Sequence, residues 1–130
     1  MSPQEMGEKI FRQNDAGTLI DDMAQPFLDL AEKFEIARLN ELDDKDWYAI
    51  LESNMFVWRF VANYLPRQLR DDVPEEMGAL LVRISEFMMQ AGSELRSNRD
   101  DTLIQRVIEL NLNMCNQILA LHDQMRENAA

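Results

Sequence analysis

Cysteine occurs only once among the 130 residues, at Cys115, so no disulfide can form within this chain. A chain without disulfides is typical of a reducing compartment, and we expect a cytoplasmic protein. The first residues are charged and lack the apolar segment of a signal peptide. The longest uncharged run, residues 110–122, contains three asparagines and is shorter than the roughly 20 apolar residues of a transmembrane helix. We therefore expect no membrane span.

Glycine and proline are also scarce, with four residues of each, and no segment alternates β-branched and polar residues. Strands and tight turns therefore have little support, and helix is expected for every long segment. The hydrophobic fraction of 46% is enough for one core, and the length fits one domain. These features predict an all-α fold, a single-domain helical bundle of about four to five helices over residues 1–130.

Positive charge is limited to 13 residues against 24 acidic ones, which gives a net charge of −11. Such a chain repels nucleic acid phosphates and anionic lipids, so we expect neither as a direct partner. The single histidine, His122, lies near the end of the chain, and there is no glycine-rich phosphate loop and no Glu-x-x-His motif. We therefore expect no enzyme activity, no cofactor and no metal site.

The most apolar stretch, residues 46–65, carries charge only at Asp46, Glu52 and Arg59. As a helix it has apolar side chains over roughly two thirds of its circumference. We predict that it is the central helix of the bundle and that the other segments wrap around it. Asp43 or Asp44 is expected to cap its beginning, and Pro66 is expected to end it.

Four further helices are predicted from periodicity and capping signals. They cover residues 2–13, 26–40, 72–95 and 102–125, so residues 1–40 form N-terminal helices and residues 46–125 the core helices. Pro26 leaves two alternatives, either a helix that starts at Gln25-Pro26 after a short turn or one longer helix that kinks there. Asp72 and Glu75 form a capping box for the helix that follows them.

Two asparagines, Asn54 and Asn111, occupy the middle of apolar helical stripes. A buried amide without partners costs about 1–3 kcal/mol, so each needs a hydrogen-bond partner. One alternative is contact with a ligand or a partner peptide. The other is that the two amides bond each other or nearby backbone and so fix the register of two helices, with Trp58 as a core aromatic. The general satisfaction of buried polar groups favours this second alternative, which places Asn54 and Asn111 within contact distance.

The nine methionines either fill an irregular core or line a groove for varied amphipathic helices. Phe56 lies at the edge of the narrow polar stripe of residues 46–65, close to Phe60. Exposed aromatics are enriched where partners dock, although the N-terminal helices could instead cover Phe56. Cys115 lies beside a core stripe and is expected to be a small buried hydrophobe rather than a nucleophile. The candidate partner-binding residues are Met55, Phe56, Phe60 and Met89.

Three motifs between Ile50 and Leu119 appear in the order and approximate spacing of a known family. They are Asn54-Met55-Phe56-Val57-Trp58, Val73-Pro74-Glu75-Glu76-Met77 and Ile108-Glu109-Leu110-Asn111 followed by Met114. In these motifs and this order the chain resembles the flagellar biosynthesis regulator FlaF family. Valine precedes both Trp58 and Pro74 where the family has leucine, and Gly78 stands where a basic residue is usual.

The resemblance implies a small cytoplasmic helical protein that acts on flagellin, assists its synthesis and export, and works with the companion regulator FlbT. From these implications we expect a flagellar regulator that binds flagellin as a chaperone-like factor. The alternative is a self-associating helical adaptor that buries the same apolar surface against a second copy. The measured mass in dilute solution distinguishes the two.

Overall fold

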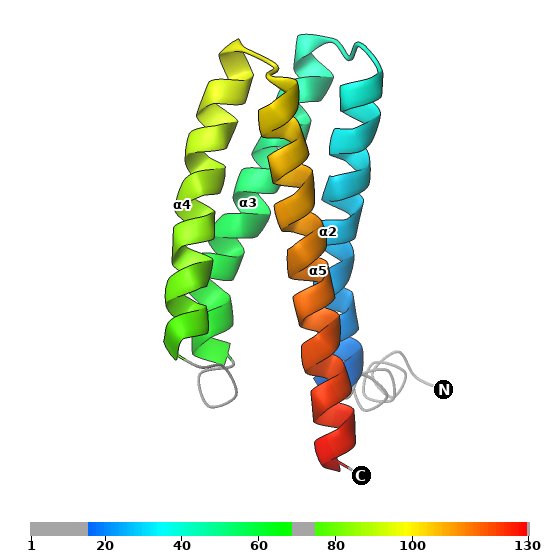
Figure 1. Ribbon diagram of the computed structural model, residues 1–130, viewed down its shortest axis with the longest axis vertical. Helices are drawn as coiled ribbons and strands as arrows, with labels where there is room; N and C mark the ends of the chain where they lie inside the picture. The colour runs from blue at the N-terminus through cyan, green and yellow to red at the C-terminus, as the bar shows by residue number, and fades with distance from the viewer. Residues whose placement is uncertain (1–15, 69–74, 130) are drawn as a thin grey trace, which may run out of the picture.

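A computed structural model describes residues 16–68 and 75–129 of the chain. In these ranges it has four helices and no strand: α2 (Ala16–Leu39), α3 (Asp44–Gln68), α4 (Glu75–Ser97) and α5 (Asp101–Ala129). Successive helices run in opposite directions and pack side by side (Figure 1). The predicted all-α bundle is confirmed. The predicted helix over residues 2–13 and the capping role of Asp72 lie outside the described residues.

Aspartates cap two of the helices. The Asp43 carboxylate accepts a hydrogen bond from the backbone N–H of Asp46 at 2.9 Å, and its carbonyl accepts one from Trp47 at 3.0 Å. Asp100 does the same at the start of α5, where its carboxylate accepts the N–H of Leu103 at 3.0 Å. Each carboxylate satisfies a backbone N–H that has no acceptor within the first turn of its helix. Asp43 is therefore the predicted cap of α3.

Proline interrupts neither of the helices in which it lies. α2 is continuous from Ala16 to Leu39 with Pro26 inside it, so the alternative of a helix starting at Gln25 is wrong. α3 extends to Gln68, past Pro66, which the sequence predicted as its end. Proline inside a helix removes one backbone hydrogen bond and costs about 3 kcal/mol. In α2 the burial of Ala24 and Phe27 on either side of Pro26 offsets this cost.

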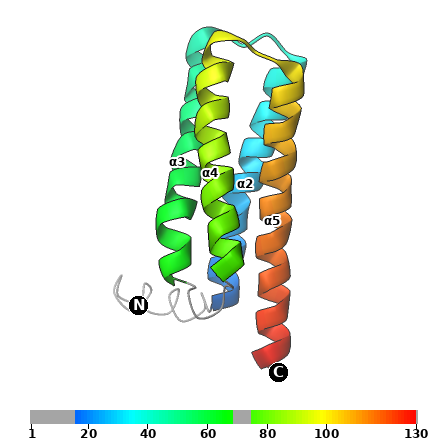
Figure 2. The same ribbon diagram turned by 60° about the vertical axis from the view of Figure 1, so that its left-hand side comes forward.

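The helices form two closely packed pairs, α2 with α5 and α3 with α4, which the two views show from different sides (Figures 1 and 2). Aromatic side chains join the pairs across the core. Phe27 of α2 meets Trp58 of α3 edge to face with ring centroids 5.3 Å apart, and Phe34 meets Trp47 in the same way at 5.9 Å. Such pairs add about 0.5–1.5 kcal/mol beyond the burial of their area. The two tryptophans of α3 are therefore fixed by α2.

α3 does not have the surrounded position that its apolar sequence predicted. One side of it is buried, while Phe56, Phe60 and the polar residues around them are exposed. α3 is thus one of four helices that surround a shared core, and the other helices do not enclose it (Figure 2). The physical reason is that each helix of a four-helix arrangement has two close neighbours, which cover only the inward part of its circumference. The core residues of α3 are Trp47, Leu51, Asn54, Trp58 and Val61.

Candidate functional site

Most of the predicted site residues lie in one of two places, a buried polar network in the core or the outer surface of α3. In the network, Asn111 Nδ2 of α5 donates to Asn54 Oδ1 of α3 at 3.0 Å. Trp58 Nε1 donates to Asn111 Oδ1 at 2.9 Å. Both asparagines and Trp58 are almost completely buried, at 3%, 0% and 0% exposure. The two amides therefore lie in direct contact, as the sequence predicted.

The direction of the hydrogen bonds is set by the tryptophan. An indole N–H can only donate, so the oxygen of Asn111 must face Trp58 and its nitrogen must face Asn54. The nitrogen of Asn54 then points to the sulfur of Met88 on α4, 3.4 Å away. The chain of donors runs from Trp58 through both amides and ends on a weak acceptor.

The polar side chains of the network are paired with one another. Among the described residues, no buried side-chain nitrogen or oxygen lacks a hydrogen-bond partner. The asparagines are therefore structural, and they tie α3 to α5 across the core.

Sequence reasoning missed three members of the network. The hydroxyl of Ser85 on α4 donates to the backbone carbonyl of Trp58 at 2.8 Å, and the sulfur of Met88 accepts from Asn54. The indole N–H of Trp58 donates to Asn111. Trp58 lies four residues after Asn54, on the same helical face, and buried tryptophans usually find an acceptor for their N–H. That spacing was a usable signal for Trp58. No comparable signal marked Ser85 or Met88.

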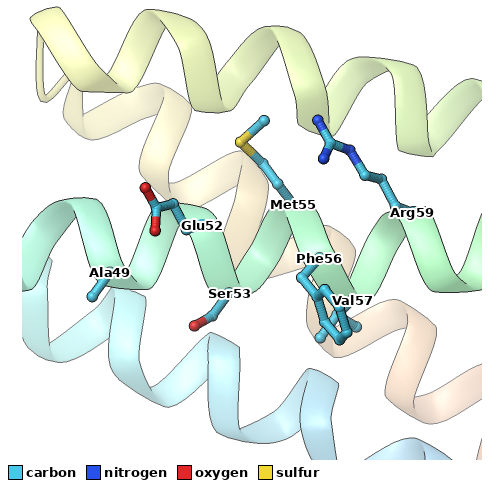
Figure 3. Close-up of a pocket in the computed structure, with 7 residues that line it drawn as sticks. All are labelled: Ala49, Glu52, Ser53, Met55, Phe56, Val57 and Arg59. Carbon is cyan, nitrogen blue, oxygen red and sulfur yellow. The ribbon is translucent and has the colours of Figure 1, made fainter.

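The outer surface of α3 carries the most exposed large hydrophobic residue of the described chain, Phe56, which is 73% exposed. Beside it lies an open hollow of about 690 Å³ (Figure 3). All the lining residues belong to α3, so the hollow runs along the surface of one helix and is not a cleft between helices. They are Ala49, Glu52, Ser53, Met55, Phe56, Val57 and Arg59.

The four residues predicted to bind a partner are only partly brought together. Met55 and Phe56 both line the hollow, and Phe60 is 46% exposed one turn beyond Phe56. Met89 of α4 is half-buried and packs against the core. Met55 extends towards α4 (Figure 3) and covers Gly92, where an added Cβ would lie 3.0 Å from the methionine sulfur. The structure thus places Met55 and Phe56 on one surface, while Met89 is not among the residues that line the hollow.

Charge on this surface is divided between two residues. Glu52 has one ion pair, with Arg96 at the long distance of 3.9 Å, and its side chain is 70% exposed. Arg59 is exposed and has no ion pair with any residue in the described ranges. The two are seven residues apart, about 10 Å along the helix, with Phe56 between them. The spacing is visible in the sequence, where the two charges form part of the narrow polar stripe of residues 46–65.

Cys115 is buried, and desolvation raises the pKa of its thiol. This agrees with the expectation of a small buried hydrophobe, because a raised pKa suppresses the reactive thiolate. The side chain of His122 lies outside the description. Among the residues that the structure describes, no three or more His, Cys, Asp or Glu side chains lie close enough together to hold a metal ion.

None of the described helices combines the length and the apolar content needed to cross a membrane. A scan against known protein families and searches of curated proteins and of solved structures found no match for this chain.

Proposed function

We propose that this protein binds another protein through the outer surface of α3, and that the bound protein is flagellin. In this role it is a cytoplasmic chaperone-like regulator that assists flagellin synthesis and export. The observation that carries the proposal is the exposure of Phe56 beside a hollow. Buried phenylalanines dominate the energetics of interfaces, so an aromatic side chain left 73% exposed is a natural anchor for a partner.

The side chains around Phe56 suit an amphipathic helix. Ala49 and Ser53 are small, so a partner helix can approach α3 closely there, and the flexible thioether of Met55 can adapt to different apolar side chains. A helix laid against α3 would present its apolar residues at intervals of three and four positions. This recognition mode needs no polar ligand site.

Flagellin as the partner comes from the resemblance to the FlaF family, and so does FlbT as a companion regulator. Three residues that carry the resemblance, Asn54, Trp58 and Asn111, hydrogen bond one another in the core. Two of the matching motifs are thus joined by one packing feature, which supports a related architecture. The partner itself depends on the family and not on these core contacts.

Isothermal titration with purified flagellin tests the proposal. We expect binding by the wild-type protein and a loss of about thirtyfold or more for Phe56→Ser, since truncation of a central anchor costs at least about 2 kcal/mol. Leu112→Ser is the matched control, because Leu112 is an exposed apolar residue on α5, 38% exposed. Binding that is absent in the wild type, or equal in Phe56→Ser and the wild type, would contradict the proposal.

A further inference from the structure

The outer surface of α3 has features that suit pairing with a second copy. Phe56 projects from it and, together with the small side chains of Ala49 and Ser53, lines an open hollow. Glu52 and Arg59 lie on the same side of α3, before and after Phe56. A surface that has a protrusion, an open hollow and both signs of charge can pair with a second copy of itself around a two-fold axis.

We propose that this protein forms a homodimer in which α3 of one protomer packs antiparallel against α3 of its partner. With the two-fold axis between Ser53 and Phe56, each Phe56 enters the hollow beside Ser53 of the other protomer. Glu52 then comes within about 3 Å, measured along the helix axis, of the level of the other protomer's Arg59, and the same contact forms a second time by symmetry. The long arginine side chain spans the remaining offset.

The availability of both charges supports this arrangement. Arg59 has no ion pair in the described part of the chain, and Glu52 has only the 3.9 Å contact to Arg96. In a parallel dimer each glutamate would face its own copy, and like charges at an interface are unfavourable. The order of charges along α3 therefore selects the antiparallel arrangement.

The dimer goes beyond the proposed flagellin binding and does not depend on it. Both use Phe56, so one surface cannot hold a second copy and a partner helix at once. A partner helix would have to displace the second copy, and the free protein would keep its exposed aromatic covered until then.

Sedimentation equilibrium over a concentration series tests the dimer. At physiological salt, where the net charge of −11 is largely screened, we expect the wild-type mass to approach twice the 15.2 kDa of one chain. Phe56→Ser is expected to remain monomeric, and Leu112→Ser to dimerise like the wild type. Circular dichroism melting checks that each variant is folded.

Charge exchange tests the orientation. Glu52→Arg and Arg59→Glu each place like charges opposite each other twice, and we expect each to weaken dimerisation by several-fold to about tenfold. The double variant Glu52→Arg/Arg59→Glu restores opposite charges only in the antiparallel dimer, so we expect it to recover wild-type affinity. A wild-type protein that stays monomeric at every concentration, or a double variant weaker than both single variants, would overturn the proposal.

The two proposals can fail separately. The mass measurement contains no flagellin, so a dimer that binds no flagellin would keep this inference and remove the proposed function. A monomer that binds flagellin would support the proposed function and overturn the dimer.

Discussion

Replacing Asn111 by leucine tests whether the buried network fixes the core. Leucine has the same branching as asparagine, so the change mainly removes the amide. Two buried groups then lose their partners, the indole N–H of Trp58 and the side-chain oxygen of Asn54. Each such group costs about 1–3 kcal/mol, so we expect Asn111→Leu to lower the free energy of unfolding by about 2–6 kcal/mol. The whole free energy of unfolding of a domain of this size is only about 5–15 kcal/mol.

The double variant gives a sharper result than either single one. Asn54→Leu leaves only the nitrogen of Asn111 without its acceptor, and it also removes the weak donor of the Met88 sulfur. Once both asparagines are leucine, only the indole N–H of Trp58 remains unsatisfied. We therefore expect the double variant to be less destabilised than the sum of the single variants by the cost of two unpaired groups, about 2–6 kcal/mol.

Urea unfolding followed by circular dichroism and tryptophan fluorescence measures these free energies. Leu112→Ser is a suitable control because it changes an exposed residue of α5. An Asn111→Leu variant as stable as the wild type would refute the reasoning, and so would strictly additive effects of the two asparagine substitutions.

Two further predictions concern Gly92 and Cys115. Gly92→Ala is expected to raise the free energy of unfolding by up to about 1 kcal/mol, because alanine favours helix and the Met55 side chain can rotate away from the new Cβ into the open hollow. A lower stability in urea unfolding would show that Met55 is held in place. Cys115 is expected to react slowly with a thiol reagent at pH 8 in the folded protein and rapidly in urea, since burial both shields the thiol and raises its pKa. Immediate complete reaction of the folded protein would contradict the burial.

The helices were predictable because their causes are local. Periodic apolar residues and the aspartate at position 43 define α3, and the polar break before residue 101 precedes α5. The error at Pro66 came from a local rule that counts the lost hydrogen bond but not the tertiary contacts of the helix as a whole, and at Pro26 the same rule left two alternatives open. α3 is longer than the local signals indicated, and α2 follows the alternative of one continuous helix.

The surface was harder to predict than the network. Asn54 and Asn111 could be paired from the sequence because a buried amide must have a partner and few candidates existed. Met89 and Phe56 both resembled groove residues, yet Met89 packs against the core and Phe56 is exposed. A helical wheel gives the direction of each side chain but not the neighbour that covers it.

The sequence by itself determined that this chain is helical and that its two stripe asparagines need hydrogen bonds, since periodicity and the cost of unpaired amides depend on the residues alone. Only the tertiary structure decided that Trp58 donates to Asn111 and that the nitrogen of Asn54 faces the sulfur of Met88. It also decided that α3 has one buried and one exposed side, with Phe56 on the exposed side. These outcomes depend on which helices become neighbours, and that choice is made by the packing of the whole core.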